Sequence, residues 1–132
     1  MSKYMDNAKA LRERTDIHIN CAQAVIMAFT KDLGLDEEAS YRIAANFGSG
    51  MKMGATCGAI TGALMTLGLA GIDDSAGLLR QARENHDGLT DCRDLLRVNA
   101  QTGTPKKQHC DGMVYELVEL TEAILKEQGV LE

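Results

Sequence analysis

The stretch FGSGMKMGATCGAITGALMTLGLAG, residues 47–71, decides the fold class of this chain. Its first part, residues 47–55, is a glycine-rich loop, and glycine reaches positive φ angles and lets another backbone come close. Thr56 is then predicted to cap a helix that carries no charged residue, with Cys57 as its first residue. A thiol there lies among free N–H groups at the positive end of the helix dipole, which favours the thiolate. We therefore expect the pKa of Cys57 to lie below its ordinary value of about 8.5.

The composition predicts an all-α protein. Of its 132 residues 45% are hydrophobic but only 4% are aromatic, so Ala, Leu, Met and Gly must fill the core. Such side chains suit closely packed helices, and Gly58 and Gly62, four positions apart on one helix face, permit a close helix crossing. We expect a single domain over residues 1–132, a compact bundle of five to seven helices around the Gly/Ala-rich central helix, with residues 1–19 as an N-terminal arm.

Capping residues and apolar spacing predict the other helices. Besides the central one they are expected at about residues 5–14, 21–33, 37–47, 74–86, 91–98 and 106–128, the last beginning at Lys106 or His109. Residues 99–105, which contain the only proline, are expected to form a polar, flexible surface loop.

Charge and hydropathy exclude several classes of partner. The net charge of −5 disfavours nucleic acids and anionic membrane surfaces, which both need a basic face. The longest uncharged run spans 20 residues, 53–72, but five are Gly, so we expect a buried helix and no membrane insertion. The N-terminus lacks the apolar segment of a signal peptide, which predicts a cytoplasmic protein. In that reducing compartment, cysteines indicate metal binding or redox chemistry more than permanent disulfides.

The four cysteines, Cys21, Cys57, Cys92 and Cys110, are separated by 36, 35 and 18 positions, so no CxxC pair is present. Their common feature is placement: three follow a predicted helix cap, and Cys110 lies near the start of the last helix. Helix starts stabilise thiolates, so several together suit a thiolate–metal centre. The alternative is that they are small core residues, since free cysteine is often buried. Two histidines near cysteines, His18 and His109, are further candidate ligands or are simply exposed polar groups.

At this point the chain resembles a known family, the redox-active proteins named C_GCAxxG_C_C for their four cysteines and a CGAxxG motif. The motif corresponds to Cys57, Gly58, Ala59 and Gly62, and the resemblance continues in NCAQAV, DCRDLL and HC around the other three cysteines. It implies redox or metal-linked chemistry in prokaryotes, sometimes near transporter genes, with the four cysteines as metal ligands. It also implies that Gly58, Ala59 and Gly62 lie against a bound cofactor. It supplies no reaction.

Three hypotheses for the function remain open at this stage. The leading one is a four-thiolate iron–sulfur centre, with Cys21, Cys57, Cys92 and Cys110 as ligands, for electron transfer or sensing. The second is a metal-free dithiol/disulfide protein in which Cys57 attacks and another cysteine resolves. The third is a structural or metal-handling zinc protein. The redox partner is unknown in each case, a homodimer is left open, and whether the chain is an enzyme is undecided.

Overall fold

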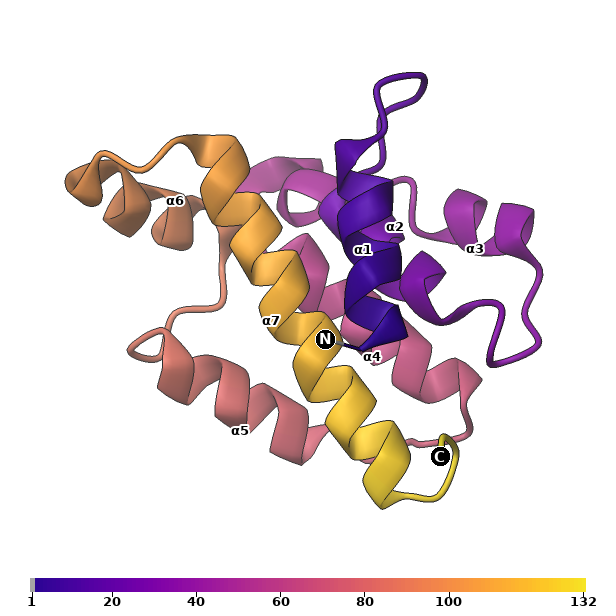
Figure 1. Ribbon diagram of the computed structural model, residues 1–132. Helices are drawn as coiled ribbons and strands as arrows, with labels where there is room; N and C mark the ends of the chain where they lie inside the picture. The colour runs from indigo at the N-terminus through magenta and orange to yellow at the C-terminus, as the bar shows by residue number, and fades with distance from the viewer. Residues whose placement is uncertain (1) are drawn as a thin grey trace.

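The computed structural model describes residues 2–132 and contains seven α-helices in that range. They are α1 Lys3–Glu13, α2 Cys21–Phe29, α3 Glu37–Ile43, α4 Gly58–Leu69, α5 Ala76–Asn85, α6 Cys92–Thr102 and α7 Lys106–Glu127 (Figure 1). A short turn, Gly50–Gly54, precedes α4. No β-strand forms among the described residues, so the all-α prediction is confirmed.

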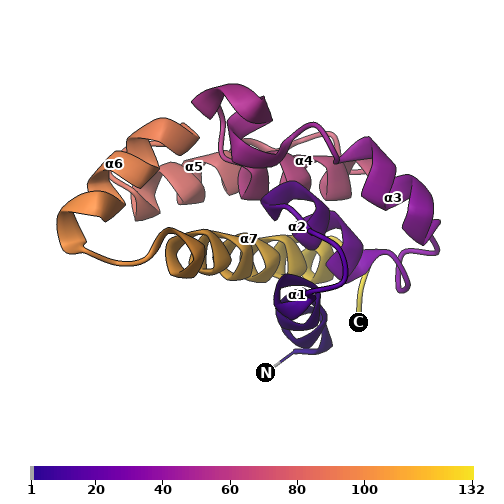
Figure 2. The same ribbon diagram turned by 90° about the horizontal axis from the view of Figure 1, so that it is seen from above.

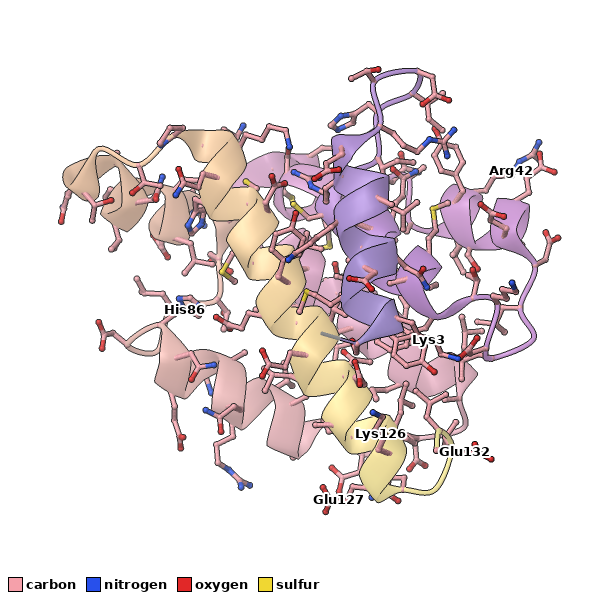
Figure 3. The ribbon with its side chains drawn as sticks, viewed as in Figure 1. Lys3, Arg42, His86, Lys126, Glu127 and Glu132 are labelled. Carbon is pink, nitrogen blue, oxygen red and sulfur yellow. The ribbon has the colours of Figure 1, made fainter. Side chains whose placement is uncertain are left out.

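Helices α2 and α4 make the most extensive contact in the molecule, and α7 packs lengthwise against both. Helix α7 also touches α1, α5 and α6, whereas α3 lies on the outside, against α2 (Figure 2). The core is mainly aliphatic, as the composition predicts: its largest fully buried side chains are Phe29, Ile26, Ile60, Leu67, Leu78, Leu117 and Leu125. Charged side chains such as Arg42 and Glu127 project outward (Figure 3).

Two glycines explain how closely α2 and α4 approach each other. A Cβ atom at Gly62 would lie 2.6 Å from the backbone oxygen of Ala22, and one at Gly58 would lie 3.2 Å from the Cβ of Cys21. Real Cβ atoms do not tolerate the first of these distances, so only glycine fits at position 62. The predicted close helix crossing is therefore confirmed, and it places the start of α4 directly beside the start of α2.

Several predicted boundaries are wrong. Helix α2 ends at Phe29 and α3 at Ile43, each about four residues earlier than expected. Helix α6 runs on to Thr102 and ends where Gly103 takes a φ of 75°, so most of the predicted 99–105 loop is helical. Polar composition misled this prediction, because an exposed helix face is as polar as a loop.

The N-terminal arm is part of the packed domain. Ser2 caps α1 by accepting a hydrogen bond from the N–H of Met5 at 3.1 Å. The ring of Tyr4 stacks on that of Phe29 with centroids 4.8 Å apart, and its hydroxyl donates to Asp32 at 2.6 Å. Within residues 2–132, no helix has both the length and the apolar composition required to cross a bilayer.

Candidate functional site

The starts of four helices meet at one cavity, and each start carries a cysteine. Cys21 and Cys92 are the first residues of α2 and α6, Cys57 immediately precedes α4, and Cys110 lies in the second turn of α7. All four side chains line a cavity of about 40 Å³, together with Ser49, Gly58, Leu95, Leu96, Lys106, His109 and Met113. The prediction that the cysteines gather in one region at helix starts is confirmed.

Cys57 and Cys92 are held next to each other by the backbone. An isolated antiparallel bridge joins Thr56 to Asp91. In it the N–H of Cys57 donates to the carbonyl of Thr90 at 2.8 Å, and the N–H of Cys92 donates to that of Ala55 at 2.6 Å. Thr56 is therefore a bridge residue, and the prediction that it caps a helix starting at Cys57 is wrong: Cys57 itself occupies the cap position of α4.

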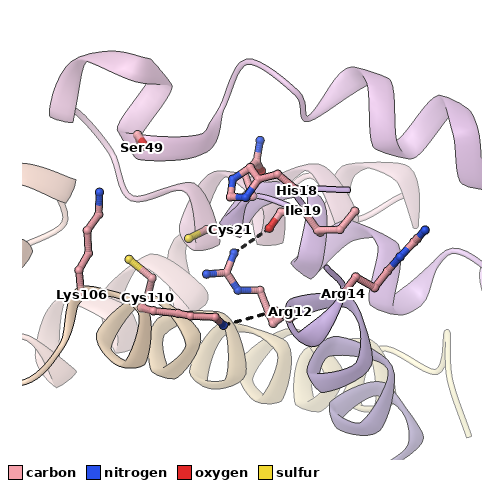
Figure 4. Close-up of a pocket in the computed structure, with 10 residues that line it drawn as sticks. Arg12, Arg14, His18, Ile19, Cys21, Ser49, Lys106 and Cys110 are labelled. Atoms are coloured by element: carbon pink, nitrogen blue, oxygen red, sulfur yellow. Dashed lines mark hydrogen bonds between the residues drawn. The ribbon is translucent and has the colours of Figure 1, made fainter. Parts of the chain in front are cut away.

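Cys21 and Cys110 form the second pair, and both side chains line the same two pockets. Their sulfur atoms lie side by side in Figure 4. The start of α2 is fixed by a capping box in which Asn20 and Gln23 exchange two hydrogen bonds of 2.8 Å. The position of Cys21 at the start of α2 is thus set by local sequence.

Arg12 is a site residue that the sequence did not reveal. Its Nε donates to Asp111 at 2.6 Å and its Nη1 donates to the carbonyl of Ile19 at 2.8 Å. The side chain is only 8% exposed, and its guanidinium group lies beside Cys21 and Cys110 (Figure 4). No local signal could have found it, because its partner Asp111 is 99 positions away.

The two members of the second pair have opposite acidities. The neighbouring Cys21 thiol is the main factor that lowers the pKa of Cys110, to about 6, and the nearby charges of Arg12 and Lys106 act in the same direction. The same interaction raises the pKa of Cys21, and burial adds to that effect. Of the two, Cys110 is therefore the thiol that favours the thiolate.

Cys57 and Cys92, the first pair, behave differently from Cys21 and Cys110. Burial raises the pKa of Cys57 to about 11, although the N–H groups of Ala59 and Ile60 act in the opposite direction. Cys57 is only 6% exposed. Burial also raises the pKa of Cys92. The prediction of an acidic Cys57 is therefore wrong, because removal from water outweighs the helix-start amides.

The remaining motif residues differ in their relation to the cavity. Gly58 lines it, whereas Ala59 and Gly62 are buried and Gly62 faces α2. A role in holding a cofactor thus stays a prediction for all three, and Gly62 has a packing role in any case. Of the histidines, His109 lines the cavity and has its pKa lowered by burial. His18 lies outside the cavity, in a neighbouring pocket.

A left-handed turn closes the cavity on one side. Ser49, Gly50, Met51 and Lys52 all have φ between 53° and 61°, and three of these four residues carry a side chain. Each such residue costs roughly 1–2 kcal/mol relative to the right-handed conformation. Ser49 lines the cavity. The loop is therefore strained next to the cysteines, where backbone strain is often associated with function.

The arrangement of donors bears on metal binding. A set of four thiols has the chemistry that iron–sulfur clusters and zinc require. As the side chains stand, however, no three His, Cys, Asp or Glu side chains within residues 2–132 are arranged to hold one metal ion. The cysteines share a cavity without forming a ligand set.

Comparison with known proteins agrees with the site. No curated protein and no solved structure matches the chain. A family model described as "Putative redox-active protein (C_GCAxxG_C_C)" matches residues 19–124, which include all four cysteines and most of the chain. The chain therefore belongs to the C_GCAxxG_C_C family.

Proposed function

We propose that this protein is a dithiol redox protein in which Cys110 and Cys21 exchange electrons with a disulfide. The observation that carries the proposal is the placement of the two side chains side by side at a pocket that both of them line (Figure 4). Two sulfur atoms must approach closely before they can form a disulfide. The attacking sulfur must also be accessible. Cys110 is half-buried, whereas Cys57 is buried, so Cys110 is the more accessible of the two.

The exchange begins with attack of the Cys110 thiolate on one sulfur of the substrate disulfide. A mixed disulfide between Cys110 and one half of the substrate forms, and the other half leaves as a thiolate. Cys21 then gives its proton to that thiolate and attacks the sulfur of Cys110, which releases the second half. In total, one thiol and one thiolate of the protein become a disulfide, and the substrate gains two electrons and becomes one thiol and one thiolate.

The surroundings of the pair support these roles. Arg12 and Lys106 favour the thiolate on Cys110, and the proton on Cys21 keeps the second sulfur unreactive until the first step is complete. Cys57 was the expected attacking residue in a metal-free protein. Its burial and raised pKa favour Cys110 for that role.

The test uses the reduced, metal-free protein and a small neutral disulfide, bis(2-hydroxyethyl) disulfide. We expect loss of two hydrogen atoms from the protein mass and a peptide in which Cys21 is linked to Cys110. Cys21→Ser should stop at a mixed disulfide on Cys110, and Cys110→Ser should not react. Cys92→Ser is the matched control and should oxidise like the unchanged protein. Oxidation of Cys110→Ser at the unchanged rate would overturn the assignment.

A second candidate is a thiolate metal centre held by Cys21, Cys57, Cys92 and Cys110, an iron–sulfur cluster or zinc. The observation that favours it is the single cavity lined by all four cysteines. A volume of about 40 Å³ is close to the space of a few water molecules, so a single ion needs less rearrangement than a multi-iron cluster. Such a centre would supply one-electron transfer if it contains iron, or structural stability if it contains zinc.

Metal content of protein prepared without oxygen tests this candidate. With iron and sulfide supplied, an iron–sulfur protein is coloured, carries iron and loses both on Cys57→Ser. Stoichiometric zinc that survives dialysis would instead indicate a structural centre. Colourless, metal-free protein that still forms the Cys21–Cys110 disulfide would contradict the metal centre, and only the dithiol function would remain.

For either chemistry we propose a reducing compartment, the cytoplasm, and a separate redox partner that returns the protein to its starting state. The support is that all four cysteines are free thiols, as is usual where glutathione and thioredoxin keep cysteines reduced.

A further inference from the structure

We infer that the substrate of the Cys21–Cys110 pair is a small disulfide that carries carboxylates, and that a basic pocket next to the pair binds it. This inference rests on the proposed dithiol function for the reaction, but the binding of anions to the pocket stands independently. It concerns the pocket drawn in Figure 4, which both cysteines line.

The pocket has the size and position of a substrate site. Its volume is about 320 Å³, at the lower end of the range of roughly 300–1,000 Å³ that is typical of small-molecule sites. Cys21, Cys110, Ser49 and Lys106 line both this pocket and the cysteine cavity. A molecule that fills the pocket therefore contacts the sulfur of Cys110.

The pocket is positively charged in a protein that is negatively charged overall. Four basic side chains line it, Arg12, Arg14, Lys106 and Lys107, and no carboxylate is found among its described lining residues. The net charge of the whole chain is −5. A basic pocket on an acidic protein points to a specific anion, because general electrostatics would repel one.

Ion pairs remove only part of this positive charge. Asp111 pairs with both Arg12 and Lys107, and Asp16 pairs with Arg14. Four cations thus face two carboxylates and the Cys110 thiolate, which leaves a surplus of one positive charge. Lys106 makes no ion pair within residues 2–132. The surplus attracts an anionic ligand.

The positions of the charges also suit a disulfide with acidic ends. Figure 4 shows the guanidinium of Arg12 on one side of the two sulfur atoms and Lys106 on the other. Helix α7 starts at Lys106, and no side chain caps its first N–H groups. These groups and the helix dipole add to the attraction for a carboxylate. A disulfide held by carboxylates on both sides presents its sulfur atoms to Cys110.

Binding is measured on Cys110→Ser, which cannot react, by calorimetry with three small disulfides that differ in charge. These are 3,3′-dithiodipropionate with two negative charges, neutral bis(2-hydroxyethyl) disulfide, and cystamine with two positive charges. We expect the dianion to bind at least tenfold more tightly than the neutral compound and cystamine not to bind. Equal affinity for the three, or no binding of the dianion, overturns the inference.

Matched variants locate the site. The double substitution Lys106→Gln/Lys107→Gln should weaken binding of dithiodipropionate at least tenfold, since both side chains line the pocket. Lys31→Gln removes a lysine that does not line it and should leave the affinity unchanged. Equal affinities for the double variant and the control would place the anion elsewhere and overturn the inference.

Reaction rates separate this inference from the proposed function. Each disulfide is reacted with the unchanged protein, and the rate is divided by that of a small free thiol. Preference for dithiodipropionate supports both ideas. Equal normalised rates, with the Cys21–Cys110 disulfide as product, overturn the substrate class but leave the dithiol function. Binding of the dianion without any oxidation of the pair overturns the dithiol function and leaves an anion site.

Discussion

The two pairs of cysteines use the same residue type at the same kind of helix start, yet they differ in almost every physical property. Cys57 and Cys92 are joined through their backbones by the bridge at Thr56 and Asp91, and burial raises both pKa values. Cys21 and Cys110 have no such bridge and face one pocket together, and the neighbouring thiol and adjacent cations lower the pKa of Cys110. The difference shows that a helix start alone does not activate a thiol. Burial and neighbouring charges decide which thiol is acidic.

The comparison also explains a division of roles. The bridge holds the starts of α4 and α6 together without using the sulfur atoms, so Cys57 and Cys92 need not react in order to hold the site in shape. The second pair lies between α2 and α7, next to Arg12, and opens to the basic pocket. We therefore assign the disulfide exchange to Cys21 and Cys110, the pair that no backbone bridge joins.

The largest expected effect is in thiol reactivity. At pH 7 the pKa values of about 6 for Cys110 and about 11 for Cys57 give thiolate fractions that differ about 10⁴-fold. The lower intrinsic nucleophilicity of the more acidic thiol offsets about 100-fold of this difference. We expect Cys110 to be alkylated by iodoacetamide about 100-fold faster than Cys57 in reduced, metal-free protein, as measured by peptide mass spectrometry. Equal rates would contradict the contrast between the pairs.

A substitution that forces α2 and α4 apart should separate Cys21 from Cys57 and so disturb the difference between the two cysteine pairs. Gly62→Ala pushes a Cβ atom against the backbone oxygen of Ala22, and we expect a loss of about 3 kcal/mol in the free energy of unfolding. Gly68→Ala on the same helix is the control, because nothing lies within 4 Å of its Cβ position. It should stabilise by about 0.5–1 kcal/mol. Urea unfolding of both variants measures the difference, and similar stabilities would contradict the close crossing.

The pH dependence of folding stability should report the raised pKa of Cys57, which distinguishes its pair from that of Cys110. Because the pKa of Cys57 is raised from 9.0 to about 11 on folding, its neutral form stabilises the fold at all pH values below 9. Between pH 9 and 11 the unfolded chain releases this proton and the folded protein keeps it, so stability falls as pH rises. We expect a loss on the order of 2 kcal/mol, seen as the difference between the unchanged protein and Cys57→Ala in unfolding experiments. Parallel pH profiles for the two proteins would show that Cys57 is not buried.

The smallest effect concerns the strained turn that contacts both pairs through Ser49. Lys52 is exposed and has a φ of 61°, so Lys52→Gly should stabilise the fold by about 1 kcal/mol. Gly50→Ala is the opposite case, because a Cβ atom there would meet Ala55 and Cys92 at a φ of 61°. It should destabilise. Thermal unfolding measures both, and a destabilised Lys52→Gly would show that the turn is not left-handed in solution.

Much of the fold could be predicted from local patterns, and some of the site could not. Asn20 with Gln23 predicts where α2 begins, and Gly62 predicts the helix crossing, because caps and close contacts leave signals within a few residues. The contact between Cys21 and Cys110 and the ion pair between Arg12 and Asp111 join parts of the chain about 90 to 100 positions apart. No local signal records such contacts. The acidity of Cys57 was mispredicted for the same reason, since its burial depends on α2, α6 and α7.

The long separation between Cys21 and Cys110 links the redox state of the protein to the lifetime of its fold. A disulfide between them closes a covalent ring of 90 residues that contains α2 to α6 and the start of α7. In the chain-entropy view, a ring of that size removes about 4–5 kcal/mol of conformational freedom from the unfolded chain. The oxidised protein should therefore resist unfolding and proteolysis much longer than the reduced one.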